Sequence, residues 1–317
     1  MGRLFITGAN GFVGRLVVEH LAKTQDRTLI TASRTSFSES SGIESYPAPD
    51  LNETSQWENF PDDVETIIHL ASRAHVMGEK ADQALPAYRK VNVEGTRGLL
   101  EMAGQKKIKR LIYLSSIKAV GESSEPGHPL SENSPLRPED PYGISKQEAE
   151  ALIQSEAPKQ GLSWTIIRPP MMYGPGMKGN LPALANLVKK PWPLPFGGIR
   201  NNRRSLLATE NLLDFLALCL RESQTTENQI FHLADPAPLS TRELIEHLAK
   251  AQNLSPKLLP VPPFILKTML SLLGKKDVAD RLLGSLEISW QKAREELDWE
   301  PPHQTSSALH RTFASSA

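Results

Sequence analysis

The sequence predicts an α/β fold, a doubly wound parallel sheet followed by a smaller, discontinuous C-terminal lobe. Three observations lead to this prediction. A short apolar strand at residues 5–7 runs into glycines spaced three apart and then into a helical segment. Apolar runs of strand length then alternate with segments of helical period as far as residue 168, as in sheets covered by helices. Beyond Pro169 and Pro170 the pattern breaks into short helices and loops.

Length and charge limit the classes of protein that fit. The 317 residues suit one large α/β domain with a second lobe. Lys and Arg together number 36, as do Asp and Glu, so no net charge would attract nucleic acid or an anionic membrane. We expect neither as a partner. The single cysteine, Cys219, lies between leucines, where a buried, inert thiol is expected, and no disulfide can form within the chain.

The termini and apolar segments indicate a cytoplasmic protein. The N-terminus enters a strand at once, without the basic flank and apolar stretch of a signal peptide. The most apolar segment, residues 264–273, contains Lys267 and falls well short of the ~20 residues that cross a bilayer. We expect it to be a packing helix.

The glycine-rich turn after the first strand predicts a phosphate-binding loop. Gly8 would permit the tight turn, Gly11 the approach of backbone to a pyrophosphate, and Gly14 the packing of helix on strand. The helix that begins at Phe12 would direct its free N–H groups at the diphosphate. A glycine triplet is also compatible with a tight turn alone. The residues predicted to hold the cofactor here are Gly8, Asn10, Gly11, Phe12, Val13 and Gly14.

Two further strand ends are predicted to border the same cofactor. Residues 27–32 form the second strand, and Ser33 and Arg34 follow it, where an arginine suits the 2′-phosphate of NADP and an acid would suit NAD. NADP is therefore preferred and NAD is possible, although Arg34 could instead be a solvated loop residue. Residues 64–70 form a buried strand that ends in small residues, where backbone can approach the cofactor. The residues predicted there are Leu70, Ala71 and Ser72, whereas the neighbouring His69 is expected to be structural.

The second half of the sheet is predicted to carry the chemistry. A helix at 84–104, a strand at 108–115, a polar loop at 122–141, a helix at 142–157 and a strand at 164–168 follow one another. We assign residues 1–168 and a returning segment at about 206–235 to the dinucleotide-binding domain. Residues 169–205 and 236–317 form the predicted substrate-binding lobe.

Tyr142 and Lys146 lie four residues apart at a helix start, so they share one face. A phenol with a pKa near ~10 is a poor acid–base group at neutral pH, and lowering it by ~3 units requires roughly 4 kcal/mol. A desolvated pocket that holds Lys146 and an oxidised nicotinamide could supply this energy. The spacing occurs by chance in many chains, but here it follows the fifth strand, which Ser115 and Ser116 close.

The pattern Thr-Gly-x-x-Gly-x-x-Gly together with Tyr142-Gly143-Ile144-Ser145-Lys146 resembles the extended short-chain dehydrogenase/reductase superfamily over nearly the whole chain. The resemblance implies that Ser116, Tyr142 and Lys146 are catalytic, that Asp50 and Leu51 lie beside the adenine, and that Asn92 braces the active site. It also implies that Asn92, Tyr142, Lys146 and Pro169 contact the cofactor. It also implies a homodimer paired through the helices at 84–104 and 142–157. Pro169 resembles the family's crossing into the substrate lobe, and the resemblance calls for no metal.

The resemblance also suggests a substrate and a branch. The substrate is expected to be a UDP-sugar, contacted by Asn180, Arg204 and Arg281 at its diphosphate and by Lys118, which could instead reach solvent. Ile117 and Lys118 stand where sugar-nucleotide 4,6-dehydratases carry Asp and Glu, which argues against dehydration. The runs 69–77, 114–122 and 280–286 look most like bacterial UDP-4-keto-6-deoxy-N-acetylglucosamine 4-reductases of surface-polysaccharide (lipopolysaccharide) synthesis.

The sequence therefore favours an NAD(P)-dependent oxidoreductase that reduces the C4 ketone of a UDP-4-keto-6-deoxy sugar. One alternative is a UDP-hexose C4-epimerase with the same tyrosine. A remote alternative is a non-catalytic dinucleotide-sensing regulator, a class that typically lacks the Tyr/Lys pair.

Overall fold

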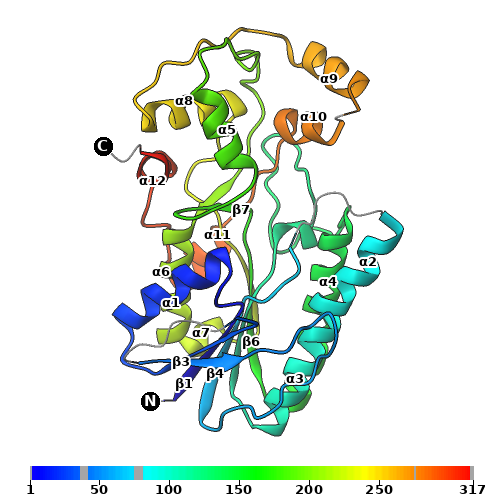
Figure 1. Ribbon diagram of the computed structural model, residues 1–317, viewed down its shortest axis with the longest axis vertical. Helices are drawn as coiled ribbons and strands as arrows, with labels where there is room; N and C mark the ends of the chain where they lie inside the picture. Colours follow the sequence, from blue (N-terminus) through cyan, green and yellow to red (C-terminus); the bar gives the residue numbers. More distant parts are fainter. Residues whose placement is uncertain (1, 36–41, 75–80, 275, 315–317) are drawn as a thin grey trace. The chain divides into compact units, whose positions relative to one another are not determined.

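The computed structural model describes residues 2–35, 42–74, 81–274 and 276–314 (Figure 1). The chain forms two compact units. The first unit comprises Met1–Glu122, Ser134–Pro169 and Phe215–His232. The second unit comprises Ser123–Asn133, Pro170–Asp214 and Leu233–Ala317.

The first unit is built on a seven-stranded sheet in which all the neighbouring strands run parallel, in the order β3-β2-β1-β4-β5-β6-β9. This topology confirms the predicted doubly wound α/β fold of the Rossmann type. Strand ends from both halves of the sheet meet at one edge, which is where ligands bind in such folds. The strands are β1 (Arg3–Thr7), β2 (Leu29–Ser33), β3 (Ile43–Pro47), β4 (Val64–His69), β5 (Arg110–Leu114), β6 (Ser163–Arg168) and β9 (Gln229–His232).

Helices cover both faces of this sheet. In Figure 1, α1 lies on one side of the sheet, and α2, α3 and α4 lie on the other. Apolar side chains of the strands pack against those of α3 and α4 and form the main core, because parallel strands are buried on both faces. The helices are α1 (Phe12–Thr24), α2 (Ala81–Arg89), a π-helix (Lys90–Glu94), α3 (Gly95–Gln105), α4 (Pro141–Glu156) and α7 (Ser223–Thr226), with 3₁₀ turns at Ile117–Ala119 and Pro158–Gln160.

The second unit holds a two-stranded parallel sheet surrounded by short helices. Residues 123–133 belong to it because Ser124 N–H donates to Ser285 O (3.0 Å) and Leu130 N–H to Glu287 O (2.8 Å). Helix α6 (Thr209–Arg221) begins in the second unit and ends in the first. The other elements are β7 (Met171–Tyr173), β8 (Leu206–Ala208), α5 (Asn180–Val188), α8 (Thr241–Ala251), α9 (Pro263–Leu272), α10 (Lys276–Leu283), α11 (Gln291–Leu297) and α12 (Thr305–Phe313).

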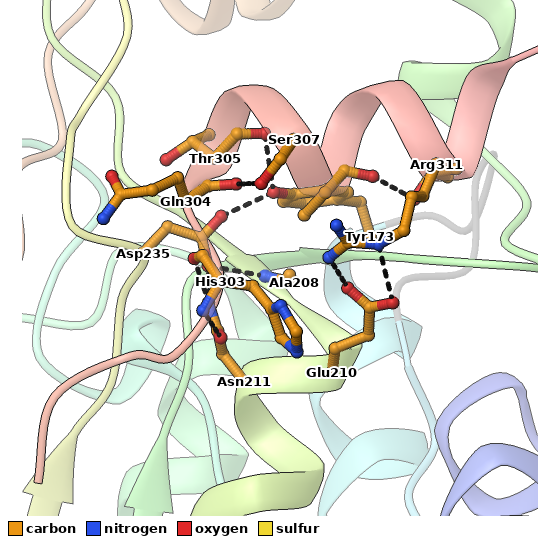
Figure 2. Close-up of polar contacts among 12 residues, drawn as sticks. Tyr173, Ala208, Glu210, Asn211, Asp235, His303, Gln304, Thr305, Ser307 and Arg311 are labelled. Atoms are coloured by element: carbon orange, nitrogen blue, oxygen red, sulfur yellow. Dashed lines mark hydrogen bonds and ion pairs between the residues drawn. The ribbon is translucent and has the colours of Figure 1, made fainter.

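A buried carboxylate holds the second unit together (Figure 2). Asp235 Oδ1 accepts hydrogen bonds from Ala208 N–H (2.8 Å) and Asn211 Nδ2 (2.7 Å), and Oδ2 accepts one from the Tyr173 hydroxyl (2.6 Å). Asn211 also exchanges two bonds with the backbone of His303 (2.9 Å each). The Asp235 side chain thus connects β7, β8 and α6, and Asn211 connects this group to the segment before α12.

Two sequence predictions need correction. The helix expected at 84–104 is divided by a π-helical turn at Lys90–Glu94, for which the apolar period gives no signal. The segment 264–273 is helical, as α9, but it is not a buried packing helix: Leu266 is buried, whereas Phe264 and Leu272 are 70% and 84% exposed. Among the described residues, no helix has the length and apolar character that a bilayer span requires.

Candidate functional site

The glycine loop adopts the geometry that its sequence predicts. Gly8 has a φ of +70°, a left-handed conformation that favours glycine, and a Cβ there would lie 2.7 Å from Ala71 N. A Cβ on Gly14 would lie 2.1 Å from Gly8 O, so α1 packs against the loop only because this residue has none. Gly11 is the N-cap of α1, and among the described residues no side chain caps the first turn. The backbone N–H groups of this first turn are therefore available to a ligand.

A cavity of about 650 Å³ lies beside this loop in the first unit. Its wall comes mainly from the carboxyl ends of β1 and β2 and from the loops that follow β1, β2, β3 and β4, and its size suits a cofactor. The predicted cofactor residues that line it are Gly8, Asn10, Gly11, Ser33, Arg34, Asp50, Leu51, Leu70, Ala71 and Ser72. The sequence analysis missed other lining residues, among them Thr7, Thr35, Asn52, Trp57, Arg73 and Val91.

The remaining predicted cofactor residues lie outside this cavity wall. Phe12, Val13 and Gly14 belong to the first turn of α1. The Pro169 carbonyl accepts a bond from Ile117 N–H (2.9 Å), which fixes the turn after β5. Asn92 reaches the site indirectly, through hydrogen bonds to the loop after β4.

Arg34 and Asp50 face each other across the end of β2. Arg34 Nη1 lies 3.6 Å from Asp50 Oδ2, and the Arg34 side chain is 67% exposed. The Asn52 backbone N–H and side chain bind the Asp50 carboxylate and lower its pKa, with a smaller contribution from Arg34. Asn10 Nδ2 donates to Ser33 Oγ (3.0 Å), which holds the β2 end against the glycine loop.

Helix α4 brings Tyr142 and Lys146 to the end of β5. Asp140 is its N-cap and accepts from Gly143 N–H (2.6 Å), and Pro141 occupies the first turn, where a missing N–H costs nothing. A Cβ on Gly143 would lie 2.4 Å from Lys118 O, so glycine lets the helix start approach the turn after Ser116.

The Lys146 side chain is 1% exposed, and its buried ammonium has two partners within the protein. Nζ donates to Leu114 O (2.7 Å) and lies 4.1 Å from the centre of the Tyr113 ring, a cation–π distance. Burial lowers the pKa of Lys146 to about 7, and the nearby Glu150 carboxylate opposes this fall.

The Tyr142 phenol is held in its protonated form. The protein atoms packed around it raise its pKa to about 12, although part of the side chain stays accessible. Hydrogen bonding with the hydroxyls of Ser116 and Ser72 counteracts the rise. Ser116 is also the N-cap of the following turn, where it accepts from Lys118 N–H (3.2 Å). The structure thus places the three predicted catalytic residues around the β5 end, with Tyr142 between two hydroxyls.

A chain of hydrogen bonds connects the glycine loop to α4 through His69. The Thr7 hydroxyl accepts from the N–H groups of Leu70 and Ala71 (3.1 Å each), so its single proton is donated to His69 Nδ1 (2.7 Å). His69 Nε2 therefore carries the ring proton and donates it to Thr96 Oγ1 (3.1 Å). Burial lowers the pKa of His69 to about 3. The neutral ring fits the structural role that the sequence predicts.

Asn92 continues the chain to the catalytic helix. The Thr96 hydroxyl donates to Asn92 O (2.7 Å), and Asn92 Nδ2 donates to Ser145 Oγ (2.9 Å). Ser145 in turn donates to Tyr142 O (2.8 Å). Asn92 Oδ1 accepts from Arg73 N–H (2.8 Å), so one buried amide joins the loop after β4 to the first turn of α4.

A buried ion pair lies one turn beyond Lys146, and the sequence analysis missed it. Glu150 and Arg168 are 1% and 2% exposed, and Arg168 donates to Glu150 through Nε (3.1 Å to each oxygen) and Nη2 (2.6 Å). Ser115 donates to the same carboxylate, and Arg168 Nη1 contacts His232 Nε2 (3.3 Å). The signal was present, since Glu150 is four residues after Lys146 and Arg168 ends a buried strand.

Lys118 is engaged within the first unit. Its Nζ donates to Asp140 Oδ2 (2.6 Å) and lies 3.2 Å from Glu122 Oε2. Burial raises the pKa of Glu122, whereas the pKa of Asp140 is lowered because hydrogen bonds from Lys118 and from Gly143 N–H outweigh its burial. The structure therefore gives Lys118 a role at the start of α4 that neither sequence alternative included.

The other predicted substrate residues lie in the second unit. Asn180 begins α5 and is exposed. Arg204 lies between β-bridges to Leu239 and Leu286, and its Nη1 donates to Gly284 O (3.2 Å), just past α10. Arg281 is in the last turn of α10. The structure therefore brings Arg204 and the end of α10 together and leaves Asn180 on a separate helix.

The residues present fit a bound dinucleotide. The cavity has a suitable volume, the loop leaves no room for a Cβ at Gly8 or Gly14, and the first turn of α1 offers N–H groups. Phosphate oxygens would accept from that turn, and the adenosine would lie toward Arg34 and Asp50. Among the described residues, no group of three or more His, Cys, Asp or Glu side chains could hold a metal ion.

Comparisons with known proteins agree with this geometry. The model of the NAD dependent epimerase/dehydratase family matches residues 4–234. UDP-glucose 4-epimerase from Vibrio cholerae is 36% identical over 98% of this chain and 94% of its own length. N-acetyl-α-D-glucosaminyl-diphospho-ditrans,octacis-undecaprenol 4-epimerase from Escherichia coli O157:H7 is 27% identical over 79% of this chain and 72% of its own.

Solved structures share the fold at low sequence identity. UDP-glucose 4-epimerase of Thermotoga maritima, solved with UDP-glucose, superposes with a TM-score of 0.76 at 20% identity and covers 98% of this chain and 97% of its own. UDP-glucuronic acid 4-epimerase of Bacillus cereus, solved with NAD, gives 0.75 at 18% identity and covers 98% and 95%.

Proposed function

Because the chain belongs to the NAD-dependent epimerase/dehydratase family, we propose that it transfers a hydride at C4 of a UDP-linked sugar, with Tyr142 as the acid–base group. The observation that carries the proposal is the grouping of Tyr142, Lys146 and Ser116 at the end of β5, in the same unit as the glycine-loop cavity. Ile117 and Lys118 replace the acids that a 4,6-dehydratase would need, so dehydration is not proposed.

The side chains divide the work at the reacting oxygen. When bound, the dinucleotide supplies the hydride donor or acceptor and, in its oxidised form, a positive charge. The protonated phenol of Tyr142, favoured by its raised pKa, gives its proton to a C4 ketone and becomes a phenolate; in the opposite direction the phenolate removes the proton of a C4 hydroxyl. Charged Lys146 stabilises the phenolate, and Ser116 hydrogen-bonds the same sugar oxygen.

The first candidate for the net reaction is C4 epimerisation. It is supported by the Vibrio cholerae relative, a UDP-glucose 4-epimerase that aligns along nearly the whole chain. In this reaction the enzyme oxidises C4 and returns the hydride to the other face of the same sugar, so no external reductant is consumed.

The second candidate is the C4 reduction of a UDP-4-keto-6-deoxy-N-acetylhexosamine in surface-polysaccharide synthesis. Arg34 favours it, because an arginine at the β2 end suits the 2′-phosphate of NADPH, a cofactor that a reductase exchanges every cycle. The Arg34–Asp50 pair would have to open to admit the phosphate.

One assay separates the two candidates. Purified protein is incubated with UDP-glucose and with UDP-N-acetylglucosamine, without added cofactor, and the sugars are separated by chromatography. An epimerase forms the corresponding galacto sugars. A reductase leaves them unchanged and oxidises one equivalent of NADPH when it receives the 4-keto-6-deoxy sugar. If neither reaction occurs, both candidates are wrong.

Tyr142→Phe tests the shared chemistry. Turnover should fall below about a tenth of the wild-type rate while dinucleotide affinity stays within a few fold, since only the proton donor is lost. Tyr88→Phe is the matched control, because its ring lies 5.9 Å from that of Tyr142 while its hydroxyl donates to Ala74 O. A Tyr142→Phe enzyme that keeps more than this activity would remove the residue from its role.

Arg34→Ala tests the cofactor. We expect the wild type to use NADPH at least as well as NADH, and the variant to lose affinity for NADPH selectively, which fluorescence titration of each reduced dinucleotide measures. Equal losses for both would show that Arg34 does not contact a 2′-phosphate.

In the second unit, we propose that Arg204 and Arg281 bind the substrate diphosphate together with Asn180, since guanidinium groups give bidentate hydrogen bonds to phosphate. A homodimer paired through the helical segments of residues 84–104 and 142–157 is proposed as well, and light scattering that gives a mass of 35.0 kDa would contradict it.

A further inference from the structure

Helix α9 exposes most of its apolar surface. Phe264, Met269 and Leu272 are 70%, 54% and 84% exposed, Ile265 is 39% exposed, and Leu273, directly after the helix, is 67% exposed. We call these five side chains the α9 surface. Single exposed apolar residues are normal, whereas five within one short helical segment require an explanation.

The α9 surface covers one continuous side of the helix. At 100° per residue, its members span about half of the circumference, with Thr268 among them. Leu266, on the adjoining side, is the buried residue through which α9 contacts the rest of its unit, including α10, which lies beside it in Figure 1. Leu270, which is half-buried, Lys267 and Ser271 occupy the remaining arc. The helix is therefore amphipathic in an unusual sense, because its wide apolar side faces solvent.

The segment around α9 is basic. Residues 247–276 contain five lysines and no Asp or Glu, although the whole chain is neutral. Lys257 precedes the helix, Lys267 lies within it and Lys276 follows it. Asp277 and Asp280 follow in α10, and Asp280 lies 3.8 Å from Lys267. The apolar side of α9 is thus bordered by positive charge.

The neutral net charge of the chain predicts no membrane partner, but on the basis of this local surface we propose that the α9 surface docks reversibly on an anionic lipid bilayer. A short helix with large apolar side chains on one side and lysines at its border is the arrangement that interfacial helices use: the apolar groups enter the headgroup–acyl boundary and the lysines bind anionic headgroups. The proposed contact is with the surface of the bilayer, so it requires no membrane-spanning helix, and none is found among the described residues.

A second copy of this chain fits the α9 surface less well. In a twofold interface the same patch meets itself, so the basic segments of both copies would approach each other. A bilayer with anionic lipids offers negative charge around an apolar interior, which matches both features of the surface at once.

Vesicle flotation tests the proposal on the full-length protein. The protein is mixed with vesicles of phosphatidylcholine alone or with phosphatidylglycerol added, and the bound fraction is measured in low and high salt. We expect binding to the anionic vesicles, weaker binding to the neutral ones, and loss of the difference in high salt, where charges are screened. No binding to anionic vesicles in low salt would overturn the proposal.

Two sets of variants assign the binding to α9. Phe264→Glu combined with Leu272→Glu should lower vesicle affinity at least about tenfold, and Lys276→Glu about fivefold. Leu136→Glu is the matched control, since Leu136 is an exposed leucine (43%) in the first unit and should keep wild-type binding. Circular dichroism checks that each variant is folded, and a milder pair, Phe264→Ser with Leu272→Ser, serves if the glutamates unfold it.

Two outcomes would overturn this assignment. The first is equal vesicle binding by the double variant and the wild type. The second is a concentration-dependent molecular mass in light scattering that the double variant abolishes, together with no vesicle binding by either protein, which would assign the α9 surface to a second copy of the chain.

Discussion

Glu150 and Asp235 are both buried carboxylates, 1% and 2% exposed, but their partners differ. Glu150, in the first unit, faces the guanidinium of Arg168 and accepts the Ser115 hydroxyl. Asp235, in the second unit, receives hydrogen bonds from neutral donors only among the partners described: two amide N–H groups and a phenol. A buried charge costs several kcal/mol unless it is paired, and the two units meet this cost in different ways.

The difference follows from what lies nearby. Glu150 is one turn from Lys146, and its carboxylate opposes the fall of the Lys146 pKa, so it has an electrostatic effect on a proposed catalytic group. Asp235 has no described catalytic candidate in contact with it, and its bonds connect β7, β8 and α6. Glu150 thus acts as a charge near the candidate catalytic residues, whereas Asp235 acts as a hydrogen-bond acceptor that connects secondary-structure elements.

Arg168→Met should have the largest effect on stability. It leaves the Glu150 carboxylate buried without its cation, which costs about 3–5 kcal/mol of the free energy of unfolding. Urea unfolding followed by circular dichroism measures the change. The double variant Arg168→Met, Glu150→Gln should recover part of the loss because the unpaired charge is gone. If the single variant loses less than about 1 kcal/mol, the pair is not a buried ion pair in solution.

Glu150→Gln should change the pH dependence of activity as well as stability. The amide keeps a hydrogen-bond acceptor for Arg168, so we expect a smaller loss of stability than for Arg168→Met. Removal of the carboxylate also removes the charge that opposes the fall of the Lys146 pKa, so this pKa should drop below its value of about 7. The alkaline limb of kcat/KM against pH should move to lower pH.

Glu148→Gln is the control for this profile. Glu148 lies on the same helix but pairs with Arg89 at the surface (2.6 Å), where solvent screens its charge. Its substitution should leave both the pH profile and the stability nearly unchanged. A Glu150→Gln profile that coincides with the wild type would mean that the carboxylate does not act on Lys146.

The sequence predicts the first unit well because its signals are local and repeated. Strands such as β1, β4 and β5 contain apolar runs that end in small or polar residues, whereas β3 (Ile43–Pro47) does not, and the close contacts of the loop depend on Gly8 and Gly14 themselves. In the second unit, α8 (Thr241–Ala251) begins at a capping box formed by Ser240 and Glu243. Strong end signals make boundaries predictable.

What the sequence did not reveal depends on contacts between distant residues. Arg168 meets Glu150 only after β6 and α4 pack, and Asp235 meets Tyr173 across 62 positions. The sequence does not reveal that Lys118 pairs with Asp140 and Glu122, so the sequence analysis offered only substrate contact or solvent exposure for this residue. The exposure of α9 was also hidden, because an apolar helix has the same composition whether a core covers it or not.

Asp235→Asn should have the smallest effect near neutral pH and the clearest signature in its pH dependence. The amide oxygen of the variant can still accept from Ala208 N–H and Asn211 Nδ2, and its amide nitrogen can donate to the Tyr173 hydroxyl, whose proton can turn to Thr305 O, already 3.3 Å away. We therefore expect a change of about 1 kcal/mol or less.

The sign of the pH effect follows from burial, which raises the pKa of Asp235 above its ordinary value of 3.8. Between that value and the raised one, the folded protein keeps a proton that the unfolded chain has released. The contribution of Asp235 to the free energy of unfolding therefore falls as pH rises through this window and is constant above it.

The amide of the Asp235→Asn variant has no proton to release, so the stability of the wild type minus that of the variant should decrease from about pH 4 upward and then level off. Urea unfolding of both proteins across this range measures the difference. A constant difference across the range would mean that Asp235 ionises in the folded protein as readily as in the unfolded chain. The second unit would then accommodate a buried charge as well as the Glu150–Arg168 pair does, by hydrogen bonds alone.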